Sequence, residues 1–290
     1  MRTHAQAAVL FEFLKQHQSY DENEAKERIE TLKEDPNVQE IYDDHGQIQG
    51  VMQTRRSNNF IHGPSASITI GCEQNEKIIA KAEVMLIAML QTLRNEGVNM
   101  VVSVSNDSFP LLEAMLTRHG MKPWYGYVFM KHDGRDVPVS PLTKRPIQPE
   151  DFMRYHRVMG ECFVPMRQAM DIRPYDVIDQ ILSDSEKFQK TYDEWLENAH
   201  SSWMYFDQDE WVGAGLFYNQ DIDDVFIPPN VQGKGYGRMI THDLIHEAKK
   251  RGFDPYIGYV KWNERAGKLY LSCGFIPFLS VTYHRMFLTP

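Results

Sequence analysis

The sequence has few cysteines, no excess of basic residues and no long apolar run. Its three cysteines, Cys72, Cys162 and Cys273, are odd in number and far apart, which argues against a disulfide framework and a zinc cluster. The 31 Lys and Arg residues against 40 Asp and Glu residues give a net charge of −9, so a nucleic-acid partner is not expected. The longest apolar run, Val84 to Leu90, is too short to span a bilayer.

The N-terminus lacks the pattern of a signal peptide, because Glu12 and Lys15 interrupt its apolar positions. An apolar fraction of 42% is enough for a packed core, and 290 residues fit two domains of ordinary size. These features predict a cytoplasmic protein, a monomer or homodimer, without a membrane partner, a nucleic-acid partner or a metal site.

Proline and turn residues gather between residues 131 and 149 and mark the expected domain boundary. On either side the same order is predicted: helices, a hairpin, a strand, a long helix, a strand, a short helix and a final strand. The sequence therefore predicts a tandem repeat of one domain type, over residues 1–135 and 143–290. Glycines end the two corresponding helices in each half, at Gly97 and Gly252 and at Gly120 and Gly274.

A strand, a glycine-rich loop and an amphipathic helix follow one another between residues 221 and 250. The N-terminus of a helix carries unpaired N–H groups and partial positive charge, and glycines let phosphate oxygens approach the backbone. Lys234 and Arg238 add cationic charge. The loop therefore predicts a phosphate-binding site, although the Walker pattern and the dinucleotide-binding glycine spacing are both absent.

This loop and a second motif downstream resemble the GNAT superfamily of N-acetyltransferases. The family loop, Q/R-x-x-G-x-G/A, is found at Gln232–Gly237, and the second motif, N-x-x-A-x-x-L-Y-x-x-x-G-F, at Asn263–Phe275. The resemblance covers residues 143–288, whereas the first half resembles the family in its element order. It implies an α/β (α+β) fold of two tandem GNAT-like domains, each with a mixed, mostly antiparallel sheet flanked by helices.

The resemblance also implies an acetyl-CoA-dependent N-acetyltransferase, in which a primary amine attacks the thioester directly in a ternary complex. In the family the acyl thioester lies where two parallel strands separate, which corresponds here to residues 223–227 and 256–260. The resemblance implies that Asn263 contacts the cofactor arm, and an asparagine there is equally suited to cap the helix that begins at Glu264. The implied cofactor-binding residues are Val225, Phe226, Ile227, Gln232, Gly233, Lys234, Gly235, Tyr236, Gly237, Arg238 and Asn263.

Three residues are candidate catalytic groups: Tyr270, Asp221 and Asp223. The family has a tyrosine at the Tyr270 position, where it protonates the departing thiolate, and the reference pKa of a phenol, about 10, suits that role. The helical spacing alone favours a core tyrosine. The family often has a base at positions that match Asp221 or Asp223, whereas strand alternation turns Asp224 to the opposite face. Solvated turn residues would explain the three acids equally well.

The first half lacks the loop, because the positions that correspond to Gln232–Gly237 are Lys77–Ala82, without a glycine. We therefore expect one acetyl-CoA per chain and a scaffold role for the first domain. Two alternatives stay open: a non-catalytic acyl-CoA-binding regulatory protein, and an acyltransferase that uses a different acyl donor. The acceptor amine is not identified, although acidic and aromatic residues at 171–197 suit a cationic or aromatic amine.

Overall fold

The computed structural model of the chain describes residues 1–18, 20, 22–59, 61–182, 184–197, 199–218 and 220–288. Its contacts divide the chain into two compact units. Unit 1 contains Met1–Tyr127 and Leu279–Pro290, and unit 2 contains Val128–Phe278. This division differs from the expected ranges, 1–135 and 143–290, because the C-terminal segment belongs to unit 1.

Unit 1 has the strand order β1-β2-β3-β4-β11. β2 is antiparallel to both β1 and β3, β4 is parallel to β3, and β11 is antiparallel to β4 from Val281 to Phe287. This last pairing explains why the C-terminal segment belongs to unit 1. The strands are β1 (Val38–Tyr42), β2 (Ile48–Asn59), β3 (Gly63–Cys72), β4 (Met100–Asn106) and β11 (Phe275–Phe287).

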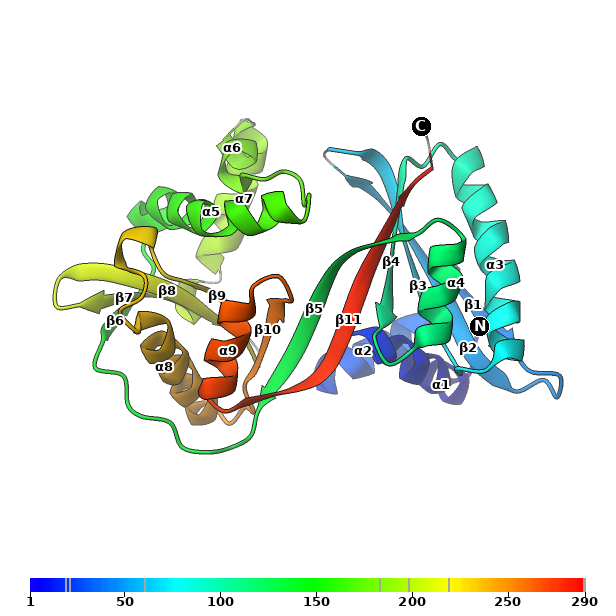
Figure 1. The fold of residues 1–290 in the computed structure, drawn as a ribbon, viewed down its shortest axis with the longest axis horizontal. Helices are drawn as coiled ribbons and strands as arrows, with labels where there is room; N and C mark the ends of the chain where they lie inside the picture. Colours follow the sequence, from blue (N-terminus) through cyan, green and yellow to red (C-terminus); the bar gives the residue numbers. More distant parts are fainter. Residues whose placement is uncertain are drawn as a thin grey trace. The chain divides into compact units, whose positions relative to one another are not determined.

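Helices cover both faces of the unit 1 strands (Figure 1). Val51 and Met52 are neighbours on β2 and point to opposite faces, as strand alternation requires. Met52 packs with α3 and α4, and Val51 packs with α1 and α2. The helices are α1 (His4–Leu14), α2 (Glu22–Leu32), α3 (Glu76–Asn95) and α4 (Pro110–Arg118), and a 3-10 turn, η1 (Lys15–His17), follows α1.

Unit 2 contains the strand order β6-β7-β8-β9-β10. Neighbouring strands are antiparallel except β9 and β10, which are parallel. A further strand, β5 (Lys122–His132), follows β10 in the order and contributes residues to both units. The others are β6 (Thr143–Pro146), β7 (Ser202–Asp207), β8 (Glu210–Tyr218), β9 (Asp221–Phe226) and β10 (Tyr256–Val260).

Figure 1 shows α5 on one face of the unit 2 strands and α8 on the other. Two glycines of β8 allow α8 to lie close to the sheet: a Cβ at Gly213 would be 2.6 Å from Ile240 Cδ1, and one at Gly215 would be 2.7 Å from Leu244 Cδ1. The helices are α5 (Phe152–Ala169), α6 (Val177–Leu182), α7 (Ser185–Glu197), α8 (Tyr236–Lys250) and α9 (Glu264–Ser272). Short 3-10 turns lie at Pro149–Asp151, Ala199–Ser201 and Pro229–Val231.

Each unit therefore has a mixed, mostly antiparallel sheet flanked by helices, which confirms the predicted α/β (α+β) fold class. The order strand, long helix, parallel strand, short helix occurs in both, as β3-α3-β4-α4 and as β9-α8-β10-α9. Among the described residues, no helix is both long and apolar enough to cross a membrane.

Candidate functional site

The glycine-rich loop of unit 2 leads from β9 to the N-terminus of α8. Gly235 is the N-cap of α8 with a φ of 90°, and Gly233 has a φ of 85°. Both values lie in the left-handed region, which glycine adopts without the steric cost of a side chain. A Cβ would have no neighbour within 4 Å at Gly233, and only Met239 Cε, at 4.0 Å, at Gly235. These two glycines therefore keep the backbone open to an incoming group.

Two cations and the first turn of α8 adjoin these glycines. The N–H groups of Tyr236 and Gly237, which begin the helix, have no intrahelical acceptor. Lys234 and Arg238 are exposed, and neither forms a salt bridge within the described part of the chain. Open N–H groups at a helix N-terminus beside unpaired cations fit the pyrophosphate of a nucleotide cofactor.

Other side chains of the loop form hydrogen bonds within unit 2 that stabilise the loop. The Gln232 amide donates to the carbonyl of Ile227 at 2.9 Å, and the Tyr236 hydroxyl donates to Asp207 Oδ2 at 2.7 Å. A Cβ at Gly237 would lie 3.2 Å from Leu269 Cδ2, so this glycine lets α8 approach α9. At these three predicted cofactor-binding positions, the backbone is therefore the part left to meet a ligand.

The parallel strands beneath the loop pair only at their beginnings. Their register contains Tyr256 opposite Asp221 and Ile257 opposite Ile222. Within the described residues no further pair joins them, although β9 continues to Phe226 and β10 to Val260. Backbone groups on the last residues of both strands are therefore not used in pairing β9 with β10.

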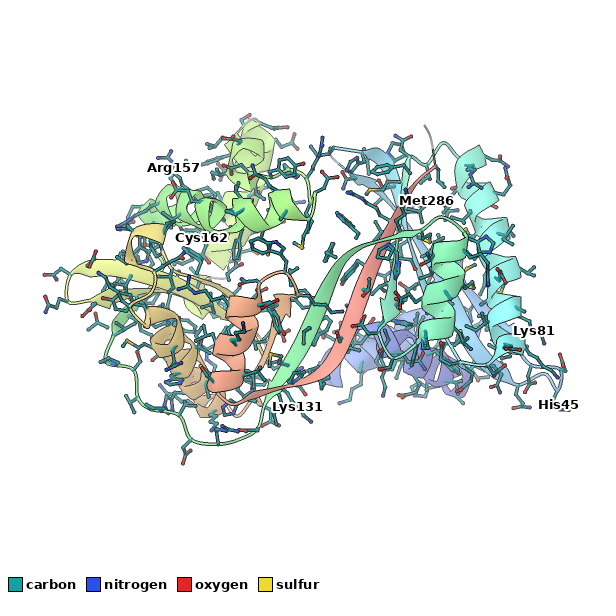
Figure 2. The ribbon with its side chains drawn as sticks, viewed as in Figure 1. His45, Lys81, Lys131, Arg157, Cys162 and Met286 are labelled. Atoms are coloured by element: carbon teal, nitrogen blue, oxygen red, sulfur yellow. The ribbon has the colours of Figure 1, made fainter. Side chains whose placement is uncertain are left out.

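The end of β9 and the start of α9 also have contacts within the chain. The carbonyl of Ile227 accepts hydrogen bonds from Gln232 and from Cys162 Sγ, the latter at 3.3 Å, and α5 carries Cys162 (Figure 2). Phe226 is buried with its ring 5.0 Å from that of Tyr155, whereas Val225 is half-buried. Asn263 Oδ1 accepts the N–H of Ala266 at 3.1 Å, so Asn263 caps α9.

Acidic and phenolic side chains meet where β9 and β10 separate. Tyr270, on α9, is 7% exposed, and burial and then the charge of Asp223 raise its pKa. Tyr155, on α5, is 2% exposed, and its pKa is raised by burial and then by Asp224 and Asp223. The Tyr155 and Tyr270 hydroxyls have no hydrogen-bond partner in the described part of unit 2.

The structure thus brings together two of the three candidate catalytic residues, Asp223 and Tyr270. Asp221 lies two residues earlier, at the paired start of β9. Sequence reasoning missed Asp224 and Tyr155. Alternation assigned Asp224 to the other face of the strand, and no local motif marks Tyr155, because its position depends on how α5 packs on β9.

The corresponding place in unit 1 is filled by the chain itself. β3 and β4 pair in parallel from Ser65 opposite Met100 to Thr69 opposite Val104. Just beyond, His17 Nδ1 accepts the N–H of Asn106 at 2.9 Å, so Nε2 carries the proton that it donates to the carbonyl of Ile70 at 2.8 Å. One imidazole therefore joins the two strands at the point where their pairing ends.

The N-terminus of α3 is closed as well. The Asn75 side chain accepts the N–H of Ile78 at 3.0 Å. Lys81, in the segment that corresponds to the glycine loop, bonds Asp44 Oδ1 at 2.7 Å and the carbonyl of Tyr42 at 2.9 Å, next to the hairpin that carries His45 (Figure 2). In its described residues, unit 1 therefore has neither the open loop of unit 2 nor a parallel strand pair whose ends are left unjoined.

Replacing His17 with alanine is expected to destabilise the protein by about 3 kcal/mol, because it leaves a buried N–H and a buried carbonyl without partners. Burial lowers the pKa of His17 to about 4. The unfolded chain, unlike the folded one, therefore binds this proton below pH 6.5, and wild-type stability falls by up to about 3 kcal/mol as the pH decreases from 6.5 to 4. Denaturant unfolding at several pH values measures both effects.

Substitution of the exposed His4 by alanine is the matched control. It should leave the unfolding free energy and its pH dependence close to wild type. A His17→Ala variant that keeps the wild-type stability and the wild-type slope between pH 6.5 and 4 would contradict the proposed joining of β3 and β4.

Among the described residues, no group of His, Cys, Asp and Glu side chains is arranged to hold a metal ion. The candidate site consists of the glycine loop, the ends of β9 and β10 where these two strands do not pair with each other, and the acids and phenols beside them.

Comparison with known proteins finds similarity in sequence and in fold. Residues 169–275 match the Acetyltransferase (GNAT) family. A GCN5-related N-acetyltransferase from Sphaerobacter thermophilus is 14% identical, with a TM-score of 0.69 over 100% of this chain and 95% of its own. A GNAT-family acetyltransferase from Colwellia psychrerythraea is 10% identical, with a TM-score of 0.52 over 98% of this chain and 97% of its own.

A tandem GNAT protein from the clavulanic acid biosynthesis pathway is 11% identical, with a TM-score of 0.52 over 99% of this chain and 95% of its own. A search of curated proteins found no match. The family match covers both the glycine loop and the second motif, and it confirms the resemblance to the GNAT superfamily that these two motifs indicated. Residues 169–275 therefore match a GNAT acetyltransferase family, within a fold that the chain shares with a tandem GNAT protein.

Proposed function

We propose that unit 2 binds acetyl-CoA and transfers its acetyl group to a primary amine. The observation that carries this proposal is the open glycine loop at the N-terminus of α8, at the end of a parallel strand pair that is paired only at its start. In this proposal the N–H groups of Gly233–Gly237 bind the pyrophosphate, and Lys234 and Arg238 add opposite charge. Backbone groups of Val225–Ile227 other than the Ile227 carbonyl, and the side-chain nitrogen of Asn263, contact the pantetheine arm, because the Ile227 carbonyl and Asn263 Oδ1 already have partners.

The chemistry is a direct transfer. The amine nitrogen forms a bond to the acetyl carbon, the carbon–sulfur bond breaks, the sulfur receives a proton, and the amine loses one. Tyr270 supplies the proton to the sulfur. Burial and then the charge of Asp223 raise its pKa, so Tyr270 carries its proton when the reaction begins. An acidic residue on β9 receives the proton of the amine.

We further propose that only unit 2 binds the cofactor. His17 occupies the ends of β3 and β4, and Asn75 caps α3, so a pantetheine arm and a pyrophosphate would meet groups that already have partners. Unit 1 then serves as a scaffold.

Titration calorimetry with acetyl-CoA, followed by a thiol-release assay with a panel of amines, tests the function. We expect one equivalent bound per chain, and thiol release with at least one class among alkylamines, polyamines, aromatic amines and peptide N-termini. Tight binding without thiol release would favour a regulatory acyl-CoA-binding protein. Two equivalents per chain would contradict the proposal that unit 1 does not bind the cofactor, and no binding would contradict the proposed function.

A further inference from the structure

A β-bulge places an unusual aspartate at the end of β9. Leu216 lies opposite Asp223, and Ala214 lies opposite Phe226. Two residues of β9, Asp224 and Val225, therefore face the single residue of β8 that lies between Ala214 and Leu216. Asp224 has a φ of 48°, in the left-handed region. A residue other than glycine is strained there, and such strain persists only where the surrounding structure imposes it.

The two neighbouring carboxylates at the bulge differ in exposure and in hydrogen bonding. The N–H of Asp224 donates to Asp223 Oδ1 at 2.8 Å, so the bulge orients the exposed carboxylate of Asp223. The half-buried carboxylate of Asp224 has neither a hydrogen bond nor a salt bridge with any described residue. A carboxylate that is partly removed from water and has no partner is destabilised in its charged form.

Two buried phenols from opposite faces of the sheet surround this position. Tyr155, on α5, lies in the field of Asp224 and Asp223, and Tyr270, on α9, lies in that of Asp223. Neither hydroxyl has a partner in the described residues. A strained bulge, an unpaired carboxylate and two unpaired phenols therefore meet where β9 and β10 separate, and strain and unmet polar groups gather at active sites.

We propose that Asp224, rather than Asp221 or Asp223, is the residue that accepts the proton of the attacking amine. This inference rests on the proposed transfer reaction. The acceptor class that it implies is an alkylamine, which arrives as a cation and is attracted by the exposed carboxylate of Asp223. It gives up one proton to Asp224 before it attacks, and the second proton that its nitrogen loses on forming the amide replaces the one that Tyr270 gave to the sulfur.

The proton affinity of Asp224 fits this role. Burial, and after it the charge of Asp223, raises its pKa to about 7. A base is most effective when its pKa is close to the working pH, because it is then both ionised and able to hold the proton. The ionisable groups that interact with it are Asp223 on β9 and Tyr155 on α5, and Tyr270 on α9 interacts with Asp223.

The test is the pH dependence of the single-turnover rate with saturating acetyl-CoA and the best alkylamine of the panel. Asp224→Asn keeps the size of the side chain and tolerates a left-handed φ. We expect this variant to be about 100-fold slower at pH 7 and to lose the acid limb of the profile near pH 7, with unchanged acetyl-CoA affinity. Asp223→Asn should shift that limb to lower pH, because it removes the charge that raises the pKa of Asp224.

Asp209→Asn, in the exposed turn between β7 and β8, is the matched control and should keep the wild-type profile. If Asp224→Asn does not fold, Asp224→Gly removes the same carboxylate and relieves the strain. A wild-type rate and profile in a folded Asp224 variant, or loss of the limb in Asp221→Asn instead, overturns the assignment. A wild-type protein that binds acetyl-CoA but transfers to no amine overturns the proposed function itself.

Discussion

Replacing Gly235 with valine is expected to weaken acetyl-CoA binding by at least about 100-fold, equivalent to ~3 kcal/mol. Two causes act together. A β-branched residue at a φ of 90° is strained by about 1–2 kcal/mol, so the loop must rearrange. Its side chain also enters the space that the loop leaves open, where a Cβ has only Met239 Cε nearby at 4.0 Å. Titration calorimetry measures the change in affinity directly.

Gly252→Val is the matched control for this experiment. Gly252 lies just beyond the other end of α8, has a φ of 81° and has no atom within 4 Å of a Cβ. The same substitution therefore imposes the same kind of strain on the same helix, at a place remote from the loop. The control should lose stability and keep its affinity. Equal affinities for wild type and Gly235→Val would exclude the loop as the pyrophosphate site.

Replacing Tyr270 with phenylalanine is expected to slow the single-turnover transfer by about 100-fold or more, because it removes the proton donor to the leaving thiolate. Acetyl-CoA affinity should change little, since the lost interaction exists mainly in the transition state. The unfolding free energy should also change little, because the Tyr270 hydroxyl has no hydrogen-bond partner among the described residues. Rapid-quench kinetics and denaturant unfolding together measure these three quantities.

Tyr205→Phe is the contrasting control, because Tyr205 belongs to the same core cluster and its hydroxyl has a hydrogen-bond partner. The Tyr205 hydroxyl donates to Asp243 Oδ2 at 2.8 Å, so its removal should cost about 1–3 kcal/mol of stability. The transfer rate of the folded variant should stay at the wild-type value. If Tyr270→Phe behaves like Tyr205→Phe, losing stability and keeping its rate, Tyr270 is a core residue and another group protonates the thiolate.

Local patterns were sufficient to predict the elements that form the site. A glycine loop between an apolar strand and an amphipathic helix identified the start of α8, because the required backbone angles are properties of a few consecutive residues. The capping role of Asn263 was predicted for the same reason. The order of elements in the two halves, matched at their helix-ending glycines, predicted a repeated domain, and the fold agrees.

Features that join distant parts of the chain could not be predicted in this way. The alternation rule applies to a regular strand. The bulge at Asp224 interrupts the alternation, because the register between β8 and β9 shifts there by one residue. The place of Tyr155 depends on the packing of α5 over β9, and that of His17 on two strands more than fifty residues away. The partner of β11 is equally non-local, since residues 281–287 pair with β4 and so belong to unit 1.

The amino-acid sequence by itself thus determined the fold class, the glycine loop and the candidate phenol at Tyr270, because each depends on residue type and short spacing. Only the tertiary structure decided which acid lies beside which phenol, and it alone placed an imidazole between the strands of unit 1. The physical reason is that desolvation and strand pairing arise from residues brought together by packing. The charge of a carboxylate and the openness of a strand end depend on those neighbours rather than on the residue itself.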